Sequence, residues 1–201
     1  MISFKNHLLA AISSGNKNTL RKSGLSQRAN LKKKDLEIES IKISNHLLRN
    51  FNLQYKNIHL FYPILKNKEV NTWHIHKAIN SNRDIFTSIY DNSKKKWDCV
   101  SFNPYVKFTK GILDIPIPID YNLESFDKID VIIIPLLVFD KFGNRIGYGK
   151  GVYDEILKKL KNNCVKIGLS IFEVSREDIQ VNDYDVALDY CQTPNELYKF
   201  K

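Results

Sequence analysis

The segment from Asp140 to Asp154 carries residue types suited to binding phosphate. It contains four glycines, together with the cations Arg145 and Lys150. Glycines leave backbone N–H groups accessible, and the start of a helix adds the positive end of its dipole, so both favour an anion. A purely structural turn would not need two cations that bracket the glycines. The segment therefore predicts a loop that cradles phosphate groups.

The spacing of this loop differs from two familiar phosphate-binding patterns. In Gly147-Tyr-Gly-Lys-Gly151 the third glycine comes one position too early for the dinucleotide fingerprint. A Walker A loop would need a glycine at the position of Asn144, and a serine or threonine at the position of Gly151. The loop has the physical properties of a phosphate cradle without either signature.

Other charged residues allow two interpretations each. Asp154, at the start of the helix predicted after the loop, could stabilise that helix through its dipole or bind Mg²⁺ beside the phosphates. Lys17 and Arg21 lie four residues apart and would share one helical face, which could bind an anion. By spacing alone, a solvated basic face is the better interpretation of this pair. His74 and His76 are too close in sequence to share a metal from one helix.

The apolar pattern predicts the elements that would position these residues. A buried strand is expected over residues 131–139 before the loop, and a helix after it, with Ile156, Leu157 and Leu160 on one face. Strands alternating with helices predict a layered α/β/α fold with a mainly parallel, possibly mixed, central sheet of Rossmann-like type. The other expected segments are helices at 17–23, ending at Gly24, at 31–51, capped by Asn30, and at 73–79, capped by Thr72; strands at 58–62, 84–90, 97–102 and 165–172; a hairpin tip at 94–96; an extended stretch at 111–118; a surface connection at 121–128; and a loop with a short strand at 180–188.

The composition of the 201 residues fits one globular domain, 1–201, with an N-terminal extension over 1–16 and a helical segment over 17–51. A net charge of +9 favours an anionic partner, which could be nucleic acid, a membrane surface or a small polyanion. Three separated cysteines indicate a reducing compartment without a disulfide or zinc framework. The apolar runs are too short to span a bilayer, and no signal peptide is recognised. We expect a cytoplasmic monomer.

The run Phe139-Asp-Lys-Phe-Gly-Asn-Arg-Ile-Gly-Tyr-Gly-Lys-Gly-Val-Tyr-Asp154 resembles the signature of the 5-formyltetrahydrofolate cyclo-ligase family. The family pattern is Phe-Asp-x-x-Gly-x-Arg-Leu-Gly-x-Gly-x-Gly-Tyr-Tyr-Asp, and Val152 replaces the first of its two adjacent aromatic residues. Weaker features agree in order along the chain: Lys17-Asn-Thr-Leu-Arg21, Glu69-Val-Asn-Thr72 and the late Asp185. The resemblance covers residues 17 to 189.

The resemblance implies a ligase that uses ATP and Mg²⁺ to convert 5-formyltetrahydrofolate to 5,10-methenyltetrahydrofolate, with phosphorylation of the N5-formyl oxygen. It implies small-molecule substrates, with no nucleic acid and no membrane. Arg145 and Lys150 would be catalytic, Asp154 and Asp185 would bind the metal, and Tyr62 and Glu69 would contact the folate. Carried over by position, the ATP-binding residues are Lys17, Arg21, Arg145, Gly147, Tyr148, Gly149, Lys150, Gly151, Val152 and Tyr153, of which Tyr148, Gly149 and Lys150 would also contact the folate.

An alternative is a basic protein that uses the same fold to bind RNA or another polyanion without catalysis. Such a protein would bind nucleic acid with a steep dependence on salt. Asp154 and Asp185 argue against it, because carboxylates repel nucleic-acid phosphates unless a metal intervenes.

Overall fold

The computed structural model describes residues 2–54, 56–79 and 84–200, with side chains from residue 16 onward. In this part of the chain an eight-stranded sheet has the order β12-β11-β10-β7-β1-β2-β3-β6. The strands from β11 to β2 are parallel, and the pairs β11–β12, β2–β3 and β3–β6 towards the two edges are antiparallel. The mainly parallel α/β fold is therefore confirmed. The strands are β1 Ile58–His59, β2 Ile85–Asp91, β3 Lys96–Phe102, β6 Asn122–Glu124, β7 Val131–Pro135, β10 Val165–Leu169, β11 Tyr190–Gln192 and β12 Leu197–Lys199.

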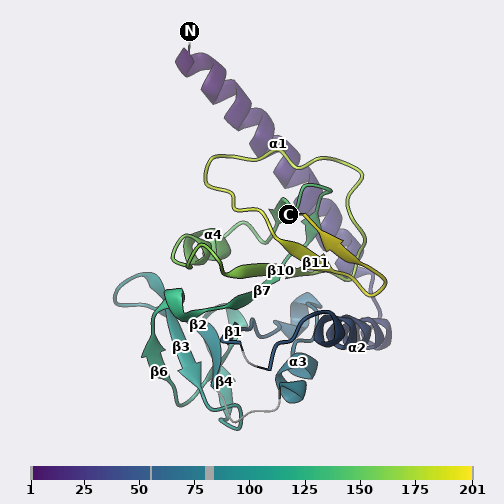
Figure 1. The fold of residues 1–201 in the computed structure, drawn as a ribbon. Helices are drawn as coiled ribbons and strands as arrows, with labels where there is room; N and C mark the ends of the chain where they lie inside the picture. The colour runs from purple at the N-terminus through teal and green to yellow at the C-terminus, as the bar shows by residue number, and fades with distance from the viewer. Residues whose placement is uncertain (1, 55, 80–83, 201) are drawn as a thin grey trace.

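Strand β7 forms the centre of the molecule because its β-branched side chains are buried on both faces of the sheet. Ile133 packs into a core with Ile43 of α2 and Ile75 of α3. Ile132 and Ile134 point to the opposite face, where they pack with residues of α4, since neighbouring strand residues alternate in direction. Figure 1 shows these helices around the sheet: α2 (Lys33–Asn50), α3 (Trp73–Ala78) and α4 (Val152–Leu157).

The prediction of one strand over residues 131–139 was wrong. Strand β7 ends at Pro135, and β8 (Val138–Phe139) pairs instead with β9 (Arg145–Ile146) as a separate antiparallel hairpin. The fully buried Asp140 holds the turn, because its carboxylate accepts the backbone N–H groups of Phe142 and Asn144, at 3.0 and 2.9 Å. The hairpin thereby turns Arg145 back towards the start of the glycine-rich loop.

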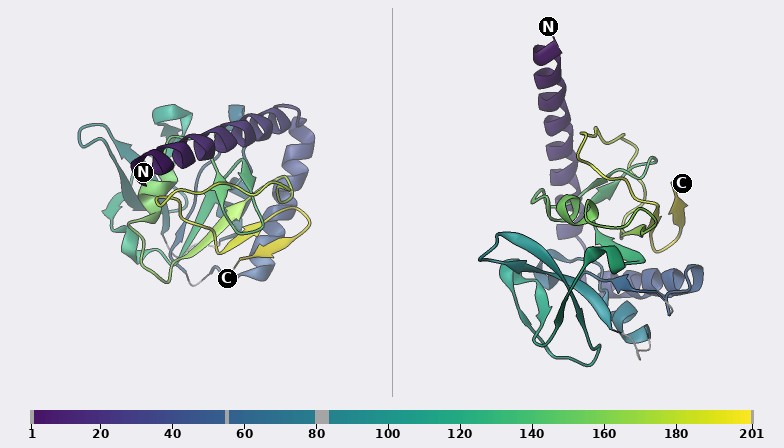
Figure 2. Two further views of the ribbon diagram at one scale, coloured as in Figure 1. Left: turned by 90° about the horizontal axis from the view of Figure 1, so that it is seen from above. Right: turned by 60° about the vertical axis from the view of Figure 1, so that its left-hand side comes forward.

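Helix α1 (Ile2–Ala29) does not end at Gly24, as the glycine had led us to expect. A Cβ at Gly24 would lie 2.9 Å from Cγ2 of Val138 and 3.2 Å from the carbonyl oxygen of Leu137. This glycine therefore lets the helix approach the β8–β9 hairpin closely, rather than terminating it. The N-terminal part of α1 projects away from the sheet, as Figure 1 and the right-hand view of Figure 2 show.

Most other predicted elements are present, with changed ends. Strands β2 and β3, helix α3 and the turn between β2 and β3 agree with the sequence, whereas β1 and β10 are shorter than expected and the 180–188 loop is followed by β11 instead of containing a strand. Lys32, not Asn30, is the N-cap residue of α2. Thr72 is the N-cap residue of α3, as predicted, but its hydroxyl donates to Phe61 O and not to the helix. Residues 111–118, expected to be extended, form η2 (Ile112–Asp114) and β5 (Pro116–Pro118), and residues 121–128, expected to be a surface connection, contain β6 and η3 (Phe126–Lys128). Two elements were not predicted: β4 (Phe108–Lys110), which pairs with β5, and η1 (Leu65–Asn67), which precedes α3. Among the described residues, no helix has the length and apolar character needed to cross a bilayer.

Candidate active site

Residues from both ends of the chain meet the glycine-rich loop. From α1, the Lys17 ammonium forms an ion pair with the Asp185 carboxylate. One turn further along the same helix, Nε of Arg21 donates to the carbonyl oxygen of Gly147, at 3.0 Å. The helix can make these contacts because Leu20, on its buried face, packs with Ile146 and Ile179. The structure thus gathers segments that are more than a hundred residues apart in sequence.

The loop glycines have the backbone geometry and the space that a bound ligand would require. Gly149 and Gly151 adopt positive φ angles of +83° and +68°, which other residues adopt only with strain. Apart from the glycine and its two chain neighbours, no atom of the described residues lies within 4 Å of a Cβ placed on Gly147 or Gly151, whereas a Cβ on Gly149 would lie 3.1 Å from Cζ of Arg21. The open space beside Gly147 and Gly151 leaves room for another group to approach the backbone.

Arg145 is already paired within the protein. Its side chain is only 7% exposed; Nη2 contacts Oδ1 of Asp154 at 2.6 Å, and Nη1 donates to the carbonyl oxygen of Val186. The charge of Asp185 also acts on Arg145, so the two carboxylates expected at the metal lie around one guanidinium. Lys150 differs, because it is exposed and makes no hydrogen bond or ion pair with any described residue.

The acidic residues fit a metal that arrives with phosphate better than a metal held by protein alone. Within the described ranges, no group of three or more His, Cys, Asp or Glu side chains is arranged to hold a metal ion. Asp154 and Asp185 each contact a cation instead. Mg²⁺ commonly needs only one or two carboxylates when substrate phosphates supply its other ligands. This pair of carboxylates is therefore adequate for Mg²⁺ bound together with phosphate.

Glu69 is a buried carboxylate next to the loop. It is 4% exposed, and its Oε2 accepts the backbone N–H of Ile64 at 2.7 Å. Burial raises the pKa of Glu69, while the Ile64 N–H, the charge of Arg28 and the hydroxyl of Tyr148 oppose that rise. Tyr148 belongs to the glycine-rich loop, so this carboxyl group and the loop are physically connected.

Tyr62 lies in an aromatic cluster on the same side of the site. It is 2% exposed, and its hydroxyl group is hydrogen bonded to Nδ1 of His76 at 2.8 Å. Its ring centroid lies 4.6 Å from those of both Trp73 and Phe108. A hollow of about 390 Å³ adjoins this cluster, lined by residues that include Ile64 and Phe108. Tyr62 therefore packs against Phe108, which lines this hollow, and direct contact of Tyr62 with a ligand stays a prediction.

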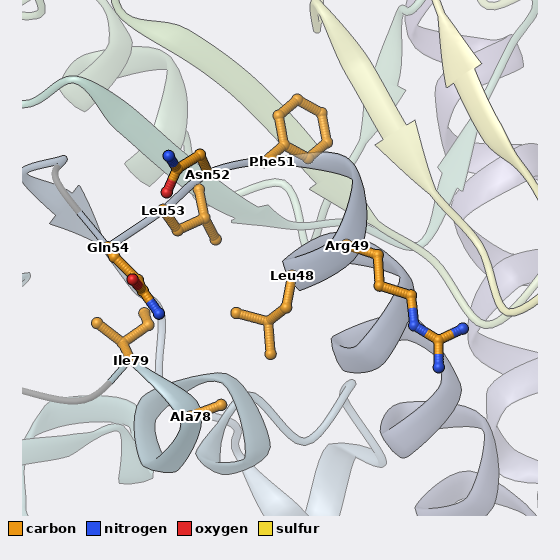
Figure 3. Close-up of a pocket in the computed structure, with 8 residues that line it drawn as sticks. All are labelled: Leu48, Arg49, Phe51, Asn52, Leu53, Gln54, Ala78 and Ile79. Carbon is orange, nitrogen blue, oxygen red and sulfur yellow. The ribbon is translucent and has the colours of Figure 1, made fainter.

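A second hollow, of about 350 Å³, lies elsewhere, between the end of α2 and the end of α3 (Figure 3). None of the residues predicted for the site lines it. Its lining residues are Leu48, Arg49, Phe51, Asn52, Leu53, Gln54, Ala78 and Ile79.

The sequence analysis missed one residue of this region, Arg28. It is 4% exposed, donates to the hydroxyl of Tyr148 and faces Glu69. Because the first helix was expected to end at Gly24, Arg28 fell into the predicted connection. The signal was its spacing from Lys17, Arg21 and Gly24, which puts all four residues on one face of a continuous helix.

Comparisons with known proteins all identify the same family. A model of the 5-formyltetrahydrofolate cyclo-ligase family matches residues 13–194. A Mycoplasma pneumoniae protein named 5-formyltetrahydrofolate cyclo-ligase is 37% identical over 73 residues, which make up 35% of this chain and 44% of that protein. With four such relatives, the matched part spans between 36% and 62% of the relative's own length, which is less than two thirds.

Solved structures match over a larger share. The structure of Aquifex aeolicus 5,10-methenyltetrahydrofolate synthetase has a TM-score of 0.77 and 23% identity, covering 92% of this chain and 93% of that one. The structure of a 5,10-methenyltetrahydrofolate synthetase from Mycoplasma pneumoniae has a TM-score of 0.68 and 25% identity, covering 89% of this chain and 98% of that one. These matches extend the similarity from the loop to the whole fold.

Proposed function

Because this chain belongs to the 5-formyltetrahydrofolate cyclo-ligase family, we propose that it converts 5-formyltetrahydrofolate to 5,10-methenyltetrahydrofolate with ATP, releasing ADP and phosphate. The observation that carries this proposal is the convergence of Lys17, Arg21 and Asp185 on the glycine-rich loop. Phosphoryl transfer depends mainly on positioning and on neutralising negative charge, and this arrangement supplies both.

The reaction moves one phosphoryl group and closes one ring. The formyl oxygen on N5 attacks the γ-phosphorus, and the bond from that phosphorus to the bridging oxygen of ADP breaks. N10 then attacks the activated formyl carbon and loses its proton; the carbon–oxygen bond breaks, and phosphate leaves with that oxygen. No protein nucleophile is required, so the side chains serve to bind, orient and stabilise charge.

Each side chain has a distinct part in this scheme. Lys150, exposed and without a partner among the described residues, is available to meet the charge that develops on the transferred phosphoryl group. Arg21 holds Gly147 and so fixes the loop backbone around the phosphates. Arg145 keeps Asp154 in place at the end of the loop. The buried Glu69 would accept hydrogen bonds from polar groups of the folate.

Asp154 and Asp185 would hold Mg²⁺, which when bound would neutralise phosphate charge. Asp185 pairs with Lys17, and Asp154 pairs with Arg145. We expect the Lys17 ammonium to turn towards the phosphates when Mg²⁺ takes Asp185, whereas Asp154 would offer the metal Oδ2, because Arg145 contacts only its Oδ1.

A turnover assay tests the proposal. Purified protein is mixed with ATP, Mg²⁺ and 5-formyltetrahydrofolate, and formation of the methenyl product is followed by its near-ultraviolet absorbance. ATP-dependent product formation is expected. Folded protein that gives no product would contradict the proposal, and steeply salt-dependent RNA binding without turnover would favour a polyanion-binding protein instead.

A further inference from the structure

Arg28 makes contacts that differ from those of the other basic residues on α1. Its Nη2 donates to the carbonyl oxygen of Leu136 at 2.6 Å, and its Nη1 donates to the hydroxyl of Tyr148 at 2.7 Å. Leu136 precedes the β8–β9 hairpin, and Tyr148 follows it. One buried guanidinium therefore ties together both ends of the hairpin that carries Arg145.

The same guanidinium faces a buried carboxylate. Both Arg28 and Glu69 are 4% exposed, and the charge of Arg28 acts on Glu69. The Tyr148 hydroxyl interacts with both groups, since it accepts from Arg28 and hydrogen bonds to Glu69. A buried cation and a buried carboxylate each need a compensating charge, and here each supplies it to the other across one hydroxyl group.

Arg28 is held in this position even though its hydrogen bonding is incomplete. Its Nε is buried and has no hydrogen-bond partner among the described residues. A lysine would carry the same charge, but it could not donate to Leu136 and Tyr148 from a planar fork. The geometry therefore requires arginine for the two contacts, in addition to a positive charge for Glu69.

We propose that Arg28 is a positioning residue that couples the glycine-rich loop to Glu69. This inference rests on the proposed function, in which the loop binds ATP and Glu69 binds folate. Arg28 fixes the loop through its hydrogen bond to Tyr148, and its charge favours the anionic form of Glu69, so each substrate site depends on the other. Loss of Arg28 therefore weakens both sites, although the side chain touches neither substrate.

The test compares Arg28→Met, Arg28→Lys and Tyr148→Phe with the unmodified protein. An opposite charge nearby lowers a carboxyl pKa by about one unit or more. Arg28→Met should therefore shift the acid limb of the pH profile of kcat/KM for 5-formyltetrahydrofolate by about one pH unit towards higher pH. The other groups that face Glu69 are Tyr148, Tyr153 and the N–H of Ile64, and Arg28→Met leaves all three in place. We expect KM to rise about tenfold for both substrates, which is the effect of losing roughly one strong interaction.

Two comparisons separate positioning from a general loss of structure. Arg28→Lys should restore the position of the acid limb, because lysine carries the same positive charge. It should not restore KM for ATP, because lysine cannot make both of the guanidinium hydrogen bonds. The double variant with Tyr148→Phe should lose no more ATP affinity than Arg28→Met alone, since both changes break one connection. Lys22→Met is the matched control, because Lys22 is exposed on the same helix, and it should leave both KM values unchanged.

The pKa of Glu69 is also measured by carbon NMR without substrates, so the coupling can be tested whether or not turnover occurs. An unmodified protein without turnover would contradict the proposed function. A pKa of Glu69 that is unchanged in Arg28→Met would overturn the inference, as would unchanged KM values in an active protein. The inference would also be overturned if the activity of Arg28→Met fell only in proportion to the amount of folded protein and Arg28→Lys did not restore the acid limb of the pH profile.

Discussion

The glycine-rich loop and the Glu69 side of the site are built in opposite ways. Around the loop, partly exposed carboxylates pair with less exposed cations, as in Asp185 with Lys17 and Asp154 with Arg145. On the other side, one buried carboxylate lies near a cluster of aromatic rings that includes Tyr62 and Phe108. In the proposed function, the loop side exchanges internal ion-pair contacts for contacts with a nucleotide and a metal. The aromatic side is fixed by packing before a ligand arrives.

This difference predicts what substitutions will do. An exposed charged group that serves to bind a ligand contributes little to the free energy of unfolding, because exposed ion pairs are weak. A side chain in the packed region contributes to stability whether or not it meets a ligand. Activity and stability should therefore separate on the loop side and change together on the aromatic side.

The largest separation is expected for Lys150→Ala. Lys150 is exposed and has no partner among the described residues, so the free energy of unfolding should change by less than about 0.5 kcal/mol. Removing a charge that stabilises the transition state should lower ATP-dependent kcat by about 100-fold or more. Lys141→Ala, on the nearby hairpin turn, is the control. Equal losses of turnover and stability would indicate that Lys150 only supports a turn.

The next largest effect concerns pH and the strand that leads to Tyr62. His59 of β1 is 1% exposed, and burial lowers its pKa from 6.5 to about 4. Below pH 6.5 the unfolded state therefore binds a proton that the folded state does not. The free energy of unfolding should fall by about 3 kcal/mol as the pH falls from 6.5 to 4.

Urea unfolding across that pH range measures this loss. His59→Gln is the informative variant, because its amide nitrogen can replace Nε2 beside the Ser88 hydroxyl, which lies 2.6 Å away in the unmodified protein. It should flatten the pH dependence, whereas His46→Gln on α2 should not. An unchanged slope in His59→Gln would assign the acid sensitivity to another group.

A smaller effect is expected for Arg145→Ala, which tests the boundary between the two regions. Arg145 lies on the loop side but is buried, and its loss removes the contact that it makes with Asp154 and with the Val186 carbonyl. Because the Asp154 side chain is 39% exposed, water compensates in part, and we expect a loss of about 2 kcal/mol of stability. Thermal unfolding with the exposed Arg176→Ala as control measures it. A change within the error of the control would place Arg145 with the weak surface pairs.

The contrast between the regions also explains which features could be read from the sequence. The loop was found because its glycines and cations lie close together in the chain, and one motif contains them. The aromatic cluster joins the segment that follows β1 to α3 and β4, and nothing in the local sequence says that Tyr62, Trp73 and Phe108 would touch. Burial of Glu69 likewise depends on elements distant in sequence, so its environment could not be predicted.

The errors in the predicted fold have physical causes as well. Residues 131–139 were read as one strand because their apolar character is continuous, but backbone pairing divides them between the sheet and the β8–β9 hairpin. Gly24 was read as a helix end, although it is a contact point for a neighbouring chain segment. In both cases tertiary contacts, which local propensity does not describe, decided the outcome.

The smallest effect is expected for Tyr62→Phe. His76 Nε2 lies 2.9 Å from the carbonyl oxygen of Pro104, which can only accept, so Nε2 carries the proton. Burial lowers the pKa of His76 and favours the neutral ring, and Nδ1 must then accept the Tyr62 hydroxyl hydrogen.

The Tyr62 hydroxyl group thus already has a hydrogen-bond partner within the protein, and its removal should cost about 1 kcal/mol of stability. Because the ring still packs, KM for 5-formyltetrahydrofolate should change less than about twofold, against about tenfold for the loss of a strong hydrogen bond to a ligand. Tyr105→Phe, at an exposed tyrosine, is the control for both measurements. A tenfold rise in KM without a loss of stability would show that the hydroxyl group serves the folate, and would make the two sides of the site alike.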